Sequence, residues 1–110
     1  MADAELKVVW ADIAAKDLEE IVSYIALESP ANAKAVLKRL RNQAEALSSM
    51  ARRGRVVPEL RDLSPEPWRE ILLRPYRIIY RISGQQILIL AVLDGRRDLE
   101  DLLLRRLLRT

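Results

Sequence analysis

The sequence predicts an α+β domain in which a hairpin of two helices packs on one face of an antiparallel sheet. Two observations predict this class. From Asp12 to Gly54 the apolar residues recur with the helical period of about 3.6 residues, and after it with the strand period of about 2. Short apolar runs bounded by proline, glycine and serine indicate strands joined by turns. The expected order is strand, helix, helix, three or four strands, helix, within a single domain spanning residues 1–110.

The first strand is expected over residues 6–10 (LKVVW), followed by two amphipathic helices. Asp12 is expected to cap the first helix and Ser29 the second, with Pro30 at its first position, where the missing N–H costs nothing. The second helix is expected to end with Arg52 and Arg53 in its last turn and Gly54 just after it. The apolar stripes of these helices comprise Leu18, Ile21, Val22 and Ile25 in the first, and Ala33, Val36, Leu37, Leu40, Ala44 and Leu47 in the second.

The strands expected after Gly54 cover residues 56–57, 68–73, 76–82 and 86–93. A polar loop with Pro65 and Pro67 separates the first two, while Pro75 and the pair Ser83-Gly84 mark the later turns, a pattern typical of an antiparallel meander. The last strand is apolar on both faces, so we expect it to lie centrally, with both faces covered.

A closing helix is expected to begin at Asp98, with acidic residues in its first turn and arginines in its last, as the helix dipole favours. Its apolar face is wider than a small domain needs. This face comprises Leu99, Leu102, Leu103, Leu104, Leu107 and Leu108.

The chain has no cysteine and no histidine, which excludes disulfides, thiolate nucleophiles, imidazole catalysis and zinc clusters. No long uncharged apolar run predicts a membrane span, and the N-terminal residues do not resemble a secretory signal. We therefore expect a cytoplasmic protein. The aromatic residues Trp10, Trp68 and Tyr24 are interpreted as core and packing residues.

The charge is unevenly distributed along the chain. Residues 1–50 carry 6 basic against 8 acidic side chains, whereas residues 51–110 carry 13 against 8, and all 13 of those bases are arginine. Arginine is suited to bidentate contacts with phosphate or carboxylate. A GC-rich genome would also raise the arginine content, but it would not explain why the lysines stop at Lys38.

Alternation in the strand over residues 76–82 (YRIIYRI) places Tyr76, Ile78, Tyr80 and Ile82 on one face and Arg77, Ile79 and Arg81 on the other. One interpretation is an anion-binding face formed by Arg77 and Arg81 and extended by Arg69 or Arg74. The alternative is a solvated face on which the arginines pair across strands, with Glu70 as the obvious partner.

The turn DGRRD ends the last strand and is a second candidate anion site. Gly95 is expected to adopt an unusual backbone angle there, and Arg96 and Arg97 to project near Arg77, unless they pair with Asp94 and Asp98. The acid–base candidates near these arginines are Glu70, Asp94, Tyr76 and Tyr80. Glu70 and Asp94 alone are a poor divalent-cation site, so we favour a site without metal or other cofactor.

Taken together, these segments resemble the RelE/ParE superfamily of toxins from type II toxin–antitoxin modules, also called plasmid-stabilisation proteins. The resemblance covers nearly the whole chain, through DLEEIVSYIALESPANA, GRVVPEL, REILLRPYRIIYRI and ILILAVLDGRRDL, and its most specific part is PYRIIYRI followed by GRRD at residues 95–98. It implies a cytoplasmic toxin that arrests growth and is held inactive by an antitoxin protein. The leucines implied to contact the antitoxin are Leu103, Leu104, Leu107 and Leu108.

The resemblance also assigns individual residues. Arg77 and Arg97 match the two arginines with which RelE-like nucleases bind phosphate. Glu70 and Leu72 stand near positions where basic residues are expected, and Asp94 stands where many relatives have histidine. The tyrosine of the C-terminal segment falls near Leu103. The resemblance thus implies that the phosphate-binding arginines of a nuclease are present, while other residue types stand where its remaining basic residues, histidine and tyrosine are expected.

Three hypotheses follow from this pattern. The favoured one is a ParE-like inhibitor of DNA gyrase, which binds a protein and catalyses nothing. The second is a RelE-like, ribosome-dependent mRNA endonuclease (an mRNA interferase), with Arg77 and Arg97 on the scissile phosphate and Glu70 or Asp94 as the base. The third is an inactive relative that serves only as a binding module for nucleic acid or antitoxin.

Overall fold

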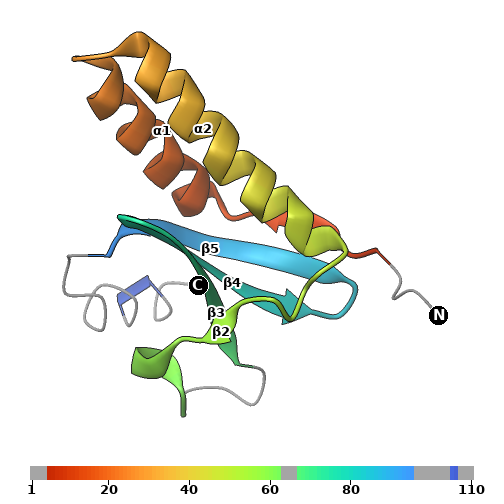
Figure 1. Cartoon of the computed structure of the whole chain (residues 1–110). Helices are drawn as coiled ribbons and strands as arrows, with labels where there is room; N and C mark the ends of the chain where they lie inside the picture. Colours follow the sequence, from red (N-terminus) through yellow and green to blue (C-terminus); the bar gives the residue numbers. More distant parts are fainter. Residues whose placement is uncertain (1–4, 63–66, 96–104, 107–110) are drawn as a thin grey trace.

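The structure, a computed structural model, describes residues 5–62, 67–95 and 105–106. Figure 1 shows a layer of two long helices lying over one face of a sheet. The elements in chain order are β1 (Lys7–Trp10), α1 (Asp12–Ala26), α2 (Pro30–Glu45), the 3₁₀ turn η1 (Ala46–Ser48), β2 (Arg55–Val56), the 3₁₀ turn η2 (Pro58–Leu60), β3 (Trp68–Leu73), β4 (Tyr76–Ser83) and β5 (Gln86–Asp94).

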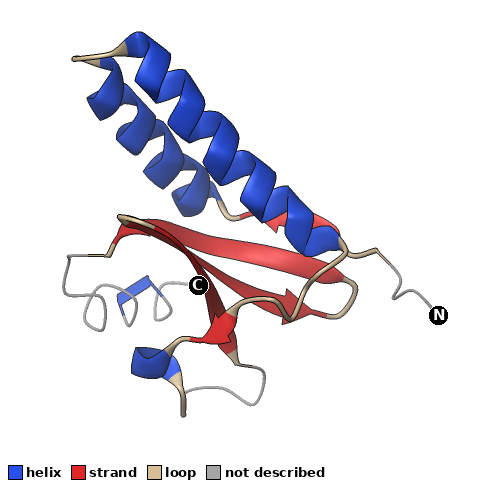
Figure 2. Ribbon diagram, in the orientation of Figure 1, coloured by secondary structure: helices blue, strands red, loops and turns tan. Residues whose placement is uncertain are grey.

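The five strands form one sheet in the order β1-β5-β4-β3-β2. The strands β2 to β5 pair antiparallel, as the meander predicts, and β1 adds to β5 in parallel. Figure 2 shows both long helices on the same side of this sheet, so the predicted α+β class is confirmed. The parallel pair is the feature that the sequence pattern did not reveal.

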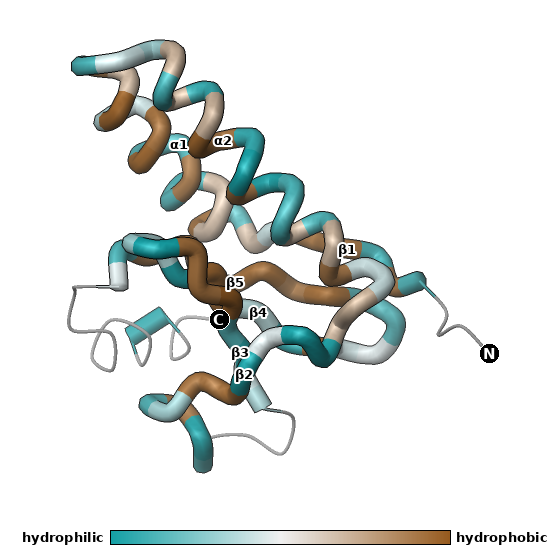
Figure 3. The backbone as a smooth tube through the Cα atoms, viewed as in Figure 1, coloured by the Kyte–Doolittle hydropathy of each residue, from teal (hydrophilic) through white to brown (hydrophobic). Residues whose placement is uncertain are grey.

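The main core lies between the helical hairpin and the sheet. It joins apolar residues of both predicted helix stripes to the sheet face that carries Tyr76, Ile78, Tyr80 and Ile82, so the predicted alternation in β4 is confirmed. In Figure 3, β5 is hydrophobic along most of its length, whereas hydrophilic residues recur between hydrophobic ones along α1 and α2.

The opposite face of the sheet carries a second, smaller apolar cluster. Val57 and Leu60, which flank and end η2, pack there against Trp68 and Ile79 and against three β5 residues, Leu90, Ala91 and Leu93. The strand β5 therefore has both faces covered and lies inside the sheet, as predicted. The segment expected to be a polar loop after Pro58 thus supplies part of a core.

The start of α2 matches its prediction, and its end does not. The Ser29 hydroxyl accepts a hydrogen bond from the Asn32 N–H at 3.1 Å, with Pro30 in the first turn. The α-helix ends at Glu45 and gives way to η1, where Ser48 exchanges hydrogen bonds with the backbone of Leu6. These hydrogen bonds to Leu6, the residue before β1, set the direction in which the chain leaves α2.

Gly54 is consequently not the residue that ends α2. It lies before β2 and is buried, and a Cβ atom there would stand 2.6 Å from the Tyr80 hydroxyl and 2.7 Å from the Glu70 carbonyl oxygen. Its backbone angle is not in the left-handed region, and within the described residues only Gly84, in the β4–β5 turn, has a positive φ. Close approach to Tyr80, and not backbone freedom, requires glycine at position 54.

Three smaller predictions need correction. Asp12 is the first residue of α1, and Ala11 occupies the N-cap without a side-chain hydrogen bond. Tyr24 is not a core residue, since 77% of its surface is exposed, whereas Trp68 is buried and Trp10 packs against the core. The first strand after Gly54 covers Arg55–Val56, one residue earlier than expected.

The closing helix lies outside the described residues except for Arg105 and Arg106, which are helical. No helix in the described ranges combines the length and the apolar character that a membrane crossing requires.

A buried aspartate on α1 completes the sheet where β1 ends. The Val92 amide lies three residues beyond Ile89, the last β5 residue that pairs with β1, and it donates to the Asp17 carboxylate at 3.0 Å. Arg106 binds both oxygens of the same carboxylate, at 2.6 and 2.8 Å, and both side chains are nearly buried. Asp17 thus links α1, β5 and Arg106.

We expect Asp17→Ala to lower the free energy of unfolding by about 3 kcal/mol, because it leaves the Arg106 charge and the Val92 amide without their partner. Urea denaturation followed by circular dichroism measures this loss. Glu19→Ala, at an exposed position of the same helix, is the matched control and should change stability by less than about 0.5 kcal/mol. Equal stabilities of the two variants would contradict the assigned role of Asp17.

Candidate functional site

The candidate site lies on the sheet face opposite the helical hairpin, where β2, β3 and β4 carry charged side chains next to one another. Arg55 pairs with Glu70 in the register of β2 and β3, and Leu72 pairs with Arg77 in the register of β3 and β4. Because alternate residues of a strand share a face, Glu70 and Leu72 lie on the same side as Arg77. The sequence-predicted residues Glu70, Leu72 and Arg77 are therefore brought together.

All three nitrogens of the Arg77 guanidinium bind carboxylates. The Nε atom donates to Glu70, and the two terminal nitrogens donate to the two oxygens of Glu59 at 3.1 and 3.2 Å. Only 11% of the Arg77 side chain is exposed. The sequence allowed either an anion-binding face or cross-strand pairing with Glu70, and Arg77 is paired with Glu70. The sequence did not reveal that a second carboxylate, that of Glu59, binds Arg77 as well.

Glu70 is the most deeply buried charged residue of the site. Its side chain has no exposed surface, and its second oxygen accepts a hydrogen bond from Arg55 Nε at 2.7 Å. A buried carboxylate is costly unless charged donors satisfy it, which Arg55 and Arg77 do here. Glu70 consequently holds the arginines of β2 and β4 on either side of β3.

A pocket of about 440 Å³ opens beside Arg77. Arg55 and Arg74 stand at this pocket with exposed side chains, while Leu72, with 44% of its surface exposed, and Pro75 supply apolar surface. Tyr76 and Gly95 complete the lining. The site is thus a mixed basic and apolar hollow next to a buried ion network.

Gly95 in the DGRRD turn was expected to adopt an unusual backbone angle, and this prediction is wrong, since its φ is not positive. Glycine is required at position 95 because the backbone of Pro75 packs closely against it. Its N–H donates to the Pro75 carbonyl oxygen at 2.7 Å, and a Cβ atom there would stand 3.2 Å from that same oxygen. Pro75 follows a cis peptide bond in the β3–β4 turn.

Two other arginines of the predicted anion-binding face are engaged elsewhere. The Arg81 guanidinium stacks over the Trp68 ring, 4.6 Å from its centroid. Arg69 pairs in register with Tyr80, whose ring belongs to the core under the helices, and it donates to the Gly54 carbonyl oxygen at 2.9 Å. Arg69 is thus turned away from the Arg77 face.

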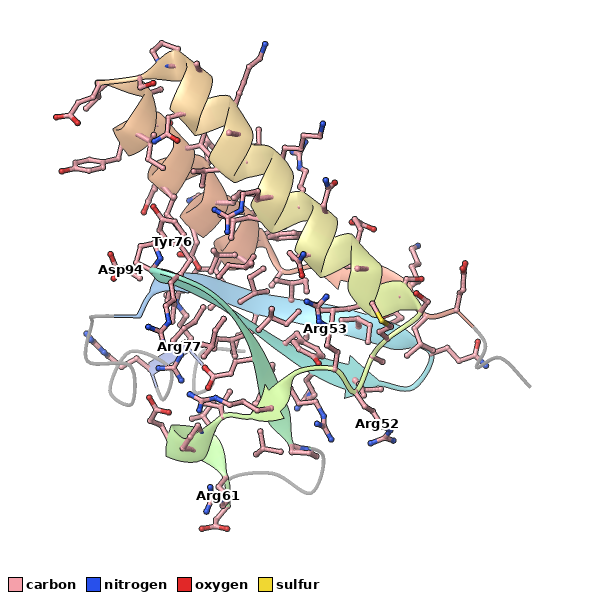
Figure 4. All side chains as sticks on the ribbon, in the orientation of Figure 1. Arg52, Arg53, Arg61, Tyr76, Arg77 and Asp94 are labelled. Carbon is pink, nitrogen blue, oxygen red and sulfur yellow. The ribbon has the colours of Figure 1, made fainter. Side chains whose placement is uncertain are left out.

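The four acid–base candidates do not converge on one point. Tyr80 is fully buried, accepting a hydrogen bond from the Gly54 N–H and donating to the Ala51 carbonyl oxygen at 2.7 Å. Asp94 pairs in register with Tyr76 and lines a groove beside α1, as does Tyr76 itself. In Figure 4, Tyr76 and Asp94 lie towards α1, while Arg77 lies on the other side of the sheet. Glu70 and Asp94 are therefore on opposite faces.

The remaining predicted site residues, Arg96, Arg97, Leu103, Leu104, Leu107 and Leu108, lie outside the described residues. Within the described ranges, no group of three acidic, histidine or cysteine side chains stands close enough to hold a metal ion.

Sequence reasoning missed Glu59 and Asp17. Glu59 gave no signal, because it follows Pro58 in a segment interpreted as a loop. Asp17 did give one, since it lies three residues after the buried Ala14 and four before Ile21, on the apolar face of α1. A carboxylate in an apolar stripe indicates a buried partner.

Comparison with known proteins identifies the family. The family model described as the ParE toxin of the type II toxin–antitoxin system parDE matches residues 8–99. The chain belongs to the ParE toxin family. A curated relative in it, Toxin ParE3 of Caulobacter vibrioides, is 36% identical over 71 residues, which span 61% of this chain and 63% of that protein.

Solved structures agree with membership of the ParE family. A chain of the chromosomal ParDE toxin–antitoxin system of P. aeruginosa superimposes with a TM-score of 0.67 and 25% identity, covering 84% of this chain and 98% of its own. A chain of the RelBE2 toxin–antitoxin complex of Mycobacterium tuberculosis gives a TM-score of 0.57 at 21% identity, covering 86% and 97%. The second likeness concerns the fold alone.

Burial raises the pKa of the Tyr80 hydroxyl above its ordinary value of 10.0, against smaller opposing effects of the Gly54 N–H, Arg69 and Arg53. Above pH 10 the unfolded chain releases this proton more readily than the folded chain. The stability that the neutral hydroxyl contributes is therefore complete below pH 10 and lost as the pH rises towards the folded pKa.

We accordingly expect Tyr80→Phe to lower the free energy of unfolding at pH 8 by about 1–3 kcal/mol, because Ala51 and Gly54 lose their partner, and to flatten the decline above pH 10. Urea titrations between pH 8 and 11 measure both effects. Tyr24→Phe, at an exposed site, should keep the wild-type profile. An undiminished alkaline decline in Tyr80→Phe would show that another group causes it.

Proposed function

We propose that this chain is the toxin of a type II toxin–antitoxin module, that it arrests bacterial growth in the cytoplasm by inhibiting DNA gyrase, and that an antitoxin protein neutralises it. Membership of the ParE family supports the module and the antitoxin partner. The observation that carries the choice of target is the state of Arg77, whose three guanidinium nitrogens are all bonded to Glu59 and Glu70.

A nuclease of this architecture requires cations that are free to stabilise the charge developing on the scissile phosphate. Arg77 matches such a cation by resemblance, yet two carboxylates of the same chain already neutralise it. The proton-transfer groups are limited as well, because Glu70 binds two arginines and the Tyr80 hydroxyl lies in the core. A toxin that acts by binding a protein needs neither group.

One observation favours the alternative, an mRNA endonuclease. Arg55, Arg74 and Arg77 line one pocket, and the exposed side chains of Arg55 and Arg74 suit an anionic substrate such as mRNA. An enzyme with this site would be independent of metal, because its cations would come from arginine side chains. The third hypothesis, a module that only binds, predicts activity in neither assay.

We expect the purified chain to inhibit supercoiling of relaxed plasmid by DNA gyrase, with relaxed plasmid persisting as the toxin concentration rises. Gel electrophoresis of the plasmid after incubation with gyrase and ATP provides the measurement. Preincubation with the cognate antitoxin should restore supercoiling, which serves as the control. Full supercoiling at a large molar excess of folded toxin would rule out gyrase as the direct target.

The nuclease alternative makes the opposite prediction for translated mRNA. If the chain cuts mRNA on the ribosome, Arg77→Ala and Arg97→Ala should each reduce the cleavage rate by about 10²–10³-fold, the usual loss when one group that stabilises transition-state charge is removed. Primer extension maps and quantifies the cuts. Antitoxin binding measured in parallel separates a loss of chemistry from a loss of folding. We expect no cleavage by the wild-type chain.

A further inference from the structure

The ion network at Arg77 has an unusual asymmetry. Glu70 is fully buried and comes from the neighbouring strand β3, whereas Glu59 comes from the short turn η2 and keeps 27% of its side chain exposed. Its two contacts, at 3.1 and 3.2 Å, occupy the terminal nitrogens in the bidentate geometry with which arginine binds any carboxylate. Glu59 is thus the more accessible of the two carboxylates that bind Arg77.

We propose that Glu59 is an internal ligand of a carboxylate-binding site, and that an acidic segment of a protein partner displaces it from Arg77 on docking in the adjoining pocket. This proposal rests on the proposed function only in taking the partner to be a protein. The site comprises Arg55, Arg74 and Arg77, with Leu72 and Pro75 as its apolar part.

The charges of the site support a carboxylate as the occupant. Three guanidinium groups face the two carboxylates of Glu59 and Glu70, which leaves an excess of one positive charge. Departure of Glu59 would raise this excess to two, and an incoming carboxylate would restore the original balance. Arg74 has an exposed side chain at this pocket and can steer the approach of the acidic segment.

The apolar part of the pocket distinguishes a peptide from a nucleic acid. Leu72 is an exposed leucine on β3, and Pro75 of the β3–β4 turn lines the same pocket. Aliphatic surface next to arginines suits a segment that carries both acidic and aliphatic side chains. Single-stranded nucleic acid would instead require aromatic surfaces for base stacking. The ring of Tyr76 does not supply one, since it packs against the core under the helices.

The test measures binding of a fluorescein-labelled 12-residue peptide of glutamate and leucine by fluorescence anisotropy. Glu59→Gln should bind it about tenfold more tightly than the wild type, because the internal competitor loses its charge while keeping its shape. Glu28→Gln, at an exposed position before α2, is the matched control and should bind like the wild type. A peptide with glutamine in place of glutamate should not bind.

A second pair of variants keeps the proposal falsifiable if Glu59→Gln fails to fold, which circular dichroism would reveal. Arg74→Ala should weaken peptide binding roughly fivefold, whereas Arg39→Ala, at an exposed position of α2, should leave it unchanged. Equal binding by these two variants, or Glu59→Gln binding no more tightly than the wild type, would overturn the proposal. Tighter, Arg74-dependent binding of a 12-nucleotide single-stranded RNA would overturn it too. None of these measurements involves gyrase, so a negative supercoiling result would leave them unaffected.

Discussion

The side chain of Glu70 has no exposed surface, and it is accommodated inside the sheet because Arg55 and Arg77 bind its two oxygens. Most of the candidate site depends on this pairing. It connects β2, β3 and β4 across one face, and through Arg77 it reaches Glu59 on η2. Removing either arginine would leave a buried carboxylate uncompensated, so the network constrains where the segment between β2 and β3 can lie.

This constraint changes the meaning of the arginine-rich strand. Arg77 and Arg81 on one face of β4 suggest an anion-binding face from the sequence, but Arg77 lies on a face that is itself partly covered by Val57 and Leu60. A covered cation must be paired within the protein, and two carboxylates of the chain satisfy it. The exposed positive charges at this site belong to Arg55 and Arg74, which line the pocket. Exposed arginines beside a paired Arg77 suit contacts with a protein better than chemistry on a phosphate.

The sequence predicted correctly which side chains of β4 face the core, but it did not predict all the residues that contact the opposite face. Side-chain alternation is a property of the extended backbone, so Ile78 and Tyr80 could be assigned to the core from the sequence alone. The end of α2 and the role of Gly54 were mispredicted because both depend on long-range contacts, with Leu6 in one case and Tyr80 in the other. Tyr24 was mispredicted because its helical spacing says nothing about how far the hairpin extends beyond the sheet.

By itself, the sequence determined the α+β class, the helical hairpin and the meander, because periodicity and turn residues act locally along the chain. The toxin superfamily was identified by the resemblance of its motifs, not by these local patterns. Only the tertiary structure decided that β1 pairs in parallel with β5, that Asp17 completes the edge of β5, and that Glu59 occupies Arg77. Each of these joins residues that are 18 or more positions apart, and such pairings depend on which surfaces meet when the core forms. The partners of a buried charge are chosen by packing, which no local pattern encodes.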